Sequence, residues 1–95
     1  MNDKLKNEGT MLLFEAMLSL KNTDECMNLF DDLCTVAEIK AMSQRLEVAF
    51  LLKSGLSYND VAKQTGASSA TISRVNRCLN YGSNGYNTVI ERLKK

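Results

Sequence analysis

Apolar residues recur along most of the chain at intervals of three and four, which is the spacing of helices with one buried face. No stretch alternates apolar and polar residues in the way of a half-buried strand. Proline is absent and glycine is scarce, which also favours helices. The sequence therefore predicts an all-α chain of six helices, at about 11–21, 24–33, 36–54, 58–65, 69–80 and 86–94.

Capping and turn residues mark the ends of these helices. Thr35 opens a capping-box pattern with Glu38. Gly55 and Gly66 are expected to end the third and fourth helices, because glycine adopts a left-handed conformation without steric cost. The clearest loop is 82–85. The expected N-caps, whose side-chain oxygens can accept a free backbone N–H, are Thr10, Thr23, Thr35 and Ser68.

The size of the chain indicates one small domain. With 95 residues it can bury only a limited fraction of its surface alone. The apolar share is 44%, but tryptophan is absent, so a core of leucine, methionine, valine and isoleucine is expected. The helix at 24–33 is apolar around much of its circumference, which requires partners on more than one side. Association with a second chain is a natural way to enlarge such a core.

Several classes of site are missing from the sequence. Histidine is absent and Cys26, Cys34 and Cys78 form no CxxC pair, so no metal site is expected. Reduced thiols packed as small apolar residues fit these cysteines and a reducing cytosol. The apolar runs are too short to span a membrane and no signal peptide is recognised, so a cytoplasmic location is expected. Without a candidate base or activated nucleophile, an enzyme is disfavoured.

Charge is divided unevenly along the chain. Residues 1–56 hold six lysines and arginines against nine acids, a net charge of −3. Residues 57–95 hold six against two, a net charge of +4. A basic half of this kind is expected of a surface that faces phosphates.

The segment 56–79, within this basic half, has the pattern of a helix-turn-helix. Ala62 is small enough for two helices to approach, and Gly66 suits the sharp turn between them. A plain helical hairpin within a bundle would show similar spacing, but a second helix rich in serine and threonine is easier to explain as a reading surface. The residues expected to point inward are Val61, Ile72 and Val75.

The outward face of the helix at 69–80 carries residues suited to DNA. A serine hydroxyl can bond a base edge or a phosphate, and an alanine can pack on a thymine methyl. The candidate base readers are therefore Ser69, Ala70 and Ser73. Backbone amides at the start of this helix can also bind a phosphate. The candidate backbone contacts are Asn59, Lys63, Ser68, Arg74 and Arg77.

With these residues the chain resembles the tryptophan repressor superfamily of bacterial transcription regulators, in particular the tryptophan-repressor-like YerC/YecD branch. The resemblance covers about Gly9–Leu93. Its most specific parts are Leu33–Glu38 (LCTVAE), Ala41–Arg45, Leu51–Gly55 (LLKSG), Gly66–Asn76 (GASSATISRVN) and Asn84–Tyr86 (NGY).

The resemblance implies an intertwined homodimer. In this family the first three helices and the last one interlock between subunits, and the fourth and fifth form a DNA-reading head. Applied here, it implies a single domain at 1–95 with a flexible N-terminus at 1–9, a dimerisation core at 10–54 and 86–94, and a helix-turn-helix head at 56–80. Such a dimer presents two copies of its fifth helix to a palindromic operator.

The family's founding member binds tryptophan as a corepressor, and the residues that match its two arginines and its threonine are Arg45, Arg74 and Thr35. Its glycine after the second arginine is Val75 here, and its serine near the ligand's amino group is Cys78. The valine should partly fill the slot, at about 1–3 kcal/mol, and the lost hydroxyl removes about 1.5–3 kcal/mol more. Affinity should fall at least about a hundredfold, so L-tryptophan is not expected as the corepressor.

Two interpretations of the retained arginines stay open. In one, Arg45 pairs with an acid such as Glu38 or Glu47, and Arg74 contacts phosphate or a partner helix. In the other, both arginines hold a different small anionic or planar ligand. The sequence identifies no cofactor and leaves an unidentified corepressor as an option.

The sequence therefore predicts a transcriptional regulator that binds double-stranded DNA sequence-specifically as a homodimer, with repression as the expected mode. The alternative, from another functional class, is a dimeric module that uses its helix-turn-helix for protein contacts. Neither interpretation requires a metal or a membrane.

Overall fold

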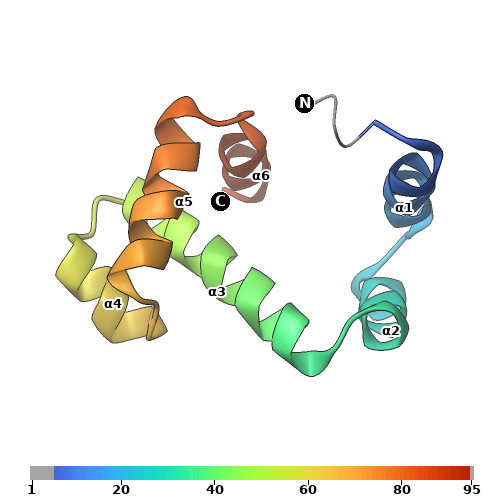
Figure 1. The fold of residues 1–95 in the computed structure, drawn as a ribbon, viewed down its shortest axis with the longest axis horizontal. Helices are drawn as coiled ribbons and strands as arrows, with labels where there is room; N and C mark the ends of the chain where they lie inside the picture. Colours follow the sequence, from blue (N-terminus) through green and yellow to red (C-terminus); the bar gives the residue numbers. More distant parts are fainter. Residues whose placement is uncertain (1–5, 95) are drawn as a thin grey trace. The chain divides into compact units, whose positions relative to one another are not determined.

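The structure is a computed structural model that describes residues 6–94, and these residues form six α-helices and no strand (Figure 1). The all-α prediction is therefore confirmed. The chain divides into two compact units, Met1–Ile39 and Lys40–Lys95, so that the boundary falls within the third helix. The helices are α1 (Glu8–Ser19), α2 (Thr23–Leu33), α3 (Val36–Lys53), α4 (Tyr58–Thr65), α5 (Ser69–Tyr81) and α6 (Gly85–Leu93).

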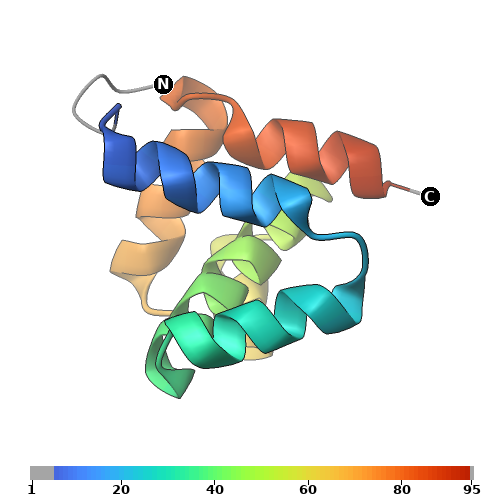
Figure 2. The ribbon, with the colours of Figure 1, turned by 90° about the vertical axis from the view of Figure 1, so that its right-hand side faces the viewer.

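The first unit contains α1 and α2, which a short extended connection joins (Figure 2). The expected caps Thr10 and Thr23 are wrong, because an asparagine precedes each of them. Asn7 accepts a hydrogen bond from Thr10 N at 2.9 Å, and Asn22 accepts one from Glu25 N at 2.9 Å. Both asparagines have extended backbones that aim the side-chain oxygen at the first turn.

The N-terminal end of α1 therefore lies earlier than the sequence pattern indicates. Glu8 and Gly9, which fall in the segment expected to be flexible, are helical. Asn7, in the same segment, caps α1, and residues 1–5 lie outside the described residues.

Neither α1 nor α2, both fully described, contains a buried residue. Leu18 is 86% exposed, Leu12 67% and Met27 64%. The described part of the first unit thus has no core of its own, although its helices carry many large apolar side chains.

A capping box begins α3, as the sequence predicts. Glu38 N donates to Thr35 Oγ1 at 3.1 Å, and Thr35 N donates to Glu38 Oε1 at 2.8 Å. The hydrogen bond from the Thr35 backbone, followed by the one with its side chain, lowers the pKa of Glu38, because both favour the charged carboxylate. The stability contributed by this ionised carboxylate is present above its unfolded pKa and is lost as the pH falls through the lowered one.

The C-terminal end of α3 has the left-handed glycine that the sequence predicts. Gly55 has φ +97°, and its N–H donates to Leu52 O at 3.1 Å. Leu56 N donates to Leu51 O at 3.2 Å, which completes a Schellman motif. This turn reverses the chain and brings Leu56 against the core.

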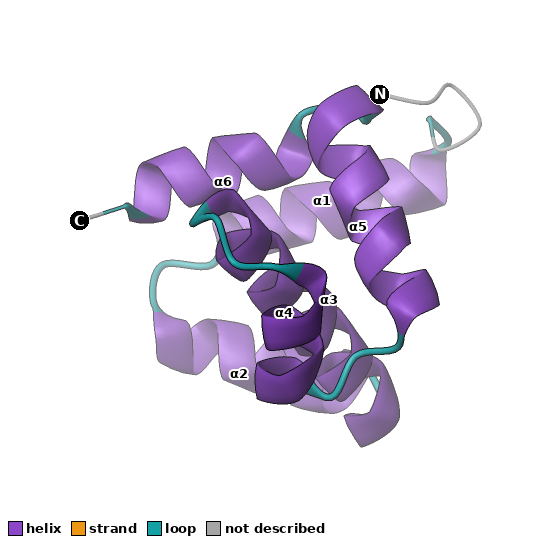
Figure 3. Ribbon diagram, turned by 90° about the vertical axis from the view of Figure 1, so that its left-hand side faces the viewer, coloured by secondary structure: helices purple, strands orange, loops and turns teal. Residues whose placement is uncertain are grey.

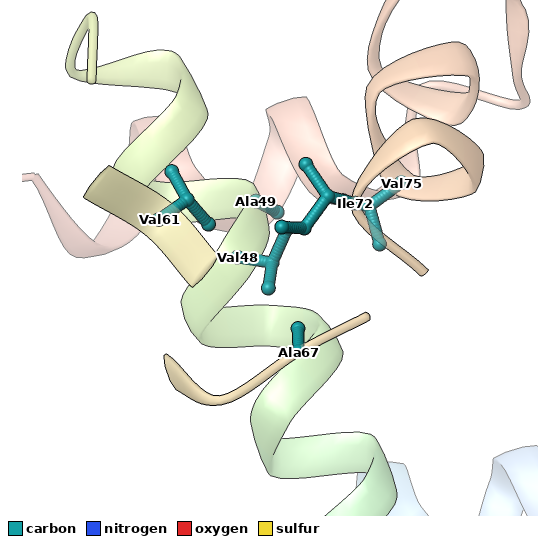
Figure 4. Packing of buried hydrophobic residues seen from close by; sticks show 6 residues of the cluster. All are labelled: Val48, Ala49, Val61, Ala67, Ile72 and Val75. Atoms are coloured by element: carbon teal, nitrogen blue, oxygen red, sulfur yellow. The ribbon is translucent and has the colours of Figure 1, made fainter. Parts of the chain in front are cut away.

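The core lies entirely in the second unit and joins α3 to the helix-turn-helix (Figure 4). Val48 and Ala49 of α3 are fully buried. Around them pack one valine of α4, the turn after it and two residues of α5. The buried set is Val48, Ala49, Val61, Ala67, Ile72 and Val75.

The last helix, α6, begins at Gly85, one residue earlier than expected. Asn84 precedes it with φ +67°, a left-handed conformation that asparagine tolerates. Asn87 Nδ2 donates to Leu79 O at 2.9 Å, and Tyr86 and Ile90 pack against the core. These contacts attach α6 to the end of α5 (Figure 3).

Gly66→Ala and Gly85→Ala form a matched pair that tests the turn between α4 and α5. A Cβ at either position meets nothing within 4 Å, so crowding does not separate the two. Gly66 has φ +72°, whereas Gly85 begins α6 without a positive φ. We expect Gly66→Ala to lower the free energy of unfolding by roughly 1–2 kcal/mol and Gly85→Ala to raise it by about 0.4–1 kcal/mol. Urea denaturation measures both changes, and shifts of the same sign would contradict this account.

Candidate nucleic-acid interface

Two serines set the beginnings of the helices in the helix-turn-helix. Ser57 Oγ accepts a hydrogen bond from Asp60 N at 3.2 Å, and Ser68 Oγ accepts one from Thr71 N at 3.2 Å. Both serines are extended, with φ near −70°. The prediction that Ser68 caps the second helix is confirmed, and α5 runs on to Tyr81.

The turn between α4 and α5 is built around Thr65, Gly66 and Ala67. Gly66 adopts the left-handed conformation and its N–H donates to Ala62 O at 2.9 Å. Thr65 Oγ1 donates to Val61 O at 2.8 Å and accepts from Ala67 N at 3.1 Å. Ala67, only 6% exposed, then enters the core. Sequence patterns identified the glycine but not the roles of Thr65 or Ala67.

The inward face of the helix-turn-helix agrees with the sequence pattern. Val61 is fully buried, and Ile72 and Val75 are each 1% exposed. These side chains meet Val48 and Ala49 of α3. Their burial fixes which residues of α5 remain on its outer side.

The outer side of α5 presents every residue proposed to read bases. Ser69, Ala70 and Ser73 are exposed, as are Arg74 and Arg77 further along the helix. The first of these residues lie at the N-terminal end of α5, where free N–H groups and the positive end of the helix dipole favour an anion. Contact with DNA by these side chains stays a prediction.

The remaining candidate backbone contacts flank this face. Asn59 and Lys63 are exposed one turn apart on α4. Ser68 is exposed, but its hydroxyl already takes part in the cap and donates to Thr71 Oγ1 at 3.1 Å. The backbone at Ser68 is therefore better placed than its side chain to meet a phosphate.

A shallow hollow of about 350 Å³ lies on the later part of α5. Its lining residues recur at helical spacing and so share one side of the helix. Sequence patterns missed Tyr81, which is 86% exposed, although its position seven residues after Arg74 was the available signal. A Cβ on Gly82 would come within 2.5 Å of Cys78 O, so no larger residue fits there unmoved. The lining residues are Arg74, Arg77, Cys78, Tyr81 and Gly82.

The candidate ligand residues fall into different surroundings. Thr35 belongs to the first unit, where its hydroxyl serves the capping box. Arg45 and Cys78 are half-buried in the second unit, and Arg45 does not line the hollow that contains Cys78. Val75 points into the core rather than into the hollow. The structure therefore brings Arg74 and Cys78 together but places Val75 on another side of α5.

Residues 6–94 contain neither a metal cluster nor a membrane span. No group of three or more His, Cys, Asp or Glu residues in this range is arranged to hold a metal ion. None of the helices in the described chain has both the length and the apolar character needed to cross a membrane.

Comparisons with known proteins agree on one family. Residues 8–94 match the family model described as Trp repressor protein. The chain is 50% identical over 93 residues to YerC, an uncharacterized protein of Bacillus subtilis, with 98% of this chain and 89% of YerC covered.

Solved structures give the same result. A TrpR-like protein from Eubacterium eligens superposes with a TM-score of 0.93 at 55% identity, covering 97% of this chain and 95% of that one. A candidate Trp repressor from Staphylococcus aureus superposes with a TM-score of 0.92 at 46% identity, covering 96% and 91%. The chain therefore belongs to the Trp repressor protein family, in its YerC-like branch, and has that family's DNA-binding regulator fold.

Proposed function

We propose that this protein is a sequence-specific transcriptional regulator that binds double-stranded DNA as a homodimer, acts in the cytoplasm and represses its targets. One observation carries the proposal: α5 is anchored by a buried apolar side and exposes small polar residues and arginines on the other. A helix so arranged can enter the major groove while the core holds its far side. The family's description favours repression over activation.

The residues of this face fall into two chemical groups, those suited to contact base edges and those suited to bind phosphates. Ser69 and Ser73 have hydroxyls for base edges, and Ala70 has a methyl for thymine. Lys63, Arg74 and Arg77 would bind phosphates, because a flexible cationic side chain holds a backbone without reading its sequence. Asn59 and the backbone at Ser68 would add neutral phosphate contacts. Because few formal charges take part, non-specific affinity should be modest.

Dimerisation is supported by the exposed apolar surface of the first unit. Helices α1 and α2 contain no buried residue. Covering their apolar side chains would stabilise the protein by roughly 25 cal/mol per Å² of apolar area removed from water. A second copy of the chain would cover this surface, with residues 10–54 and 86–94 as the dimerisation core and 56–80 as the reading head. Two-fold symmetry would then present two reading helices to a palindrome.

The core position of Val75 argues against tryptophan as the corepressor. Its side chain is 1% exposed and packs with Val48 and Ile72. A ligand ring at this point would have to displace part of the core, which close-packed interiors resist. Arg45 and Arg74 would then serve the protein or DNA phosphates, with another small anionic or planar ligand as the alternative.

Selection of bound sequences from a random pool of double-stranded DNA tests the function itself. We expect enrichment of a palindrome whose half-sites lie about 10 base pairs apart, since each reading helix enters a successive major groove. The selection needs no added metabolite under this proposal. A pool that enriches no sequence would contradict groove reading and favour the helix-turn-helix as a protein-contact module.

Arg77→Ala tests the proposal that Arg77 binds a DNA phosphate and does not read a base. The variant should bind the selected operator and unrelated DNA more weakly by similar factors. The slope of log K against log salt should fall by about 1.8, because each protomer of the homodimer loses one phosphate contact and each contact contributes about 0.9. Lys6→Ala removes a charge of the same sign from an exposed position outside both the dimerisation core and the reading head, and it should leave the slope unchanged. Fluorescence anisotropy across a salt series measures both variants. An unchanged slope for Arg77→Ala would exclude this phosphate contact. If the helix-turn-helix instead binds a protein partner through apolar contacts, the substitution should leave that binding unchanged.

Isothermal titration with L-tryptophan tests the statement about the corepressor. We expect no binding in the micromolar range, because Val75 occupies core space and Cys78 lacks the hydroxyl that would hold the ligand's ammonium group. The selected operator should also bind equally well with and without millimolar tryptophan. A micromolar dissociation constant would overturn this part of the proposal.

A further inference from the structure

A side chain of α3 reaches the turn of the helix-turn-helix. Gln44 Nε2 donates a hydrogen bond of 3.1 Å to Thr65 O, 21 positions further along the chain. The bond is partly buried, and Gln44 itself is half-buried. It is a directional contact between the supporting helix and the turn that precedes the reading helix.

The acceptor is one that α4 cannot satisfy itself. Thr65 is the last residue of α4, and carbonyls in a last helical turn have no N–H four residues ahead within the helix. The hydroxyl of the same residue donates to Val61 O and accepts from Ala67 N. Thr65 thus links α4, the turn and, through Gln44, α3.

This linkage lies close to the part of α5 that would read bases. Thr65 precedes Ser69 by only four residues, whereas Arg77 lies eight residues further on. At a rise of about 1.5 Å per residue, Arg77 is about 12 Å along the helix from Ser69. A small movement of the turn therefore displaces the reading end of α5 first.

The apolar core does not by itself fix this end of the helix. Burial of Val48 against Ile72 is favourable but non-directional, so related arrangements can satisfy it. A hydrogen bond has a narrow range of distance and angle. Base contacts require placement within about 0.5 Å, whereas long arginine and lysine side chains follow a phosphate through larger shifts.

We propose that Gln44 is a positioning residue that fastens the turn to α3 and so orients the reading end of α5. The effect on DNA binding rests on the function proposed above. The attachment of the turn to α3 by Gln44 does not depend on that function. The hydrogen bond between Gln44 and Thr65 then holds α5 in the orientation that reads bases, and no small molecule is needed for this.

The test is Gln44→Met, which keeps the length of the side chain and removes its donor. Gln64→Met is the matched control, because Gln64 is the other glutamine of the chain and is exposed on α4. Hydrogen exchange of the free proteins is measured first. In Gln44→Met the amides of Gly66 and Ala67 should exchange about tenfold faster, while those of α6 stay unchanged, since a partly buried acceptor loses its partner.

DNA affinity provides the second measurement, with the operator selected by the wild-type protein and an unrelated duplex. Gln44→Met should bind the operator about tenfold more weakly, with less than a twofold change for the unrelated duplex. Gln64→Met should match the wild type in both. A purely structural role would weaken both duplexes alike.

The outcomes separate the two proposals. Unchanged exchange in Gln44→Met, or the same change in Gln64→Met, overturns the fastening role. Faster exchange with an equal loss on both duplexes keeps the fastening but overturns the effect on reading. If the wild-type protein selects no operator, the proposed function fails, and the exchange data still decide whether Gln44 fastens the turn.

Discussion

The packing of the middle of α3 against the helix-turn-helix is the contact on which the second unit depends. Val48 and Ala49 are adjacent in the sequence, and their full burial gives α4, the turn and α5 a common support. Removing that support would leave two short helices, one of only eight residues, that isolated chains hold poorly. The orientation of the head therefore derives from α3 rather than from α4 and α5 alone.

Neighbouring positions on α5 have opposite surroundings as a result. Arg74 is exposed while Val75 is buried, because one residue turns the helix by about 100°. From the sequence, Val75 was expected to fill part of a ligand slot. In the structure its contacts are those of a core residue. Evolution of ligand binding at this position would thus also alter the stability of the head.

Features that depend on local chemistry could be predicted from the sequence. The caps at Ser68 and Thr35 and the left-handed Gly55 and Gly66 each depend on one residue and its next few neighbours. The helix starts at Asn7 and Asn22 could not be placed, because a threonine nearby offers a similar capping oxygen.

Features that depend on contacts between distant segments escaped prediction. Ala67 has the polar neighbours of a loop residue but is buried, and Gln44 resembles any surface glutamine of a helix. Tyr81 is exposed in line with the arginines of α5, and its interval of seven residues from Arg74 was the one signal for this placement in the sequence. The outward face of α5 could be inferred earlier because its helical spacing is regular.

The absence of a buried residue from α1 and α2 has a consequence for the proposed homodimer. When a segment acquires its core only from a second copy, its folding is coupled to association, and its stability depends on protomer concentration. Dimer formation, and with it operator occupancy, would then rise more steeply than the amount of protein. In a regulator that needs no corepressor, the cellular abundance of the chain would itself act as the signal.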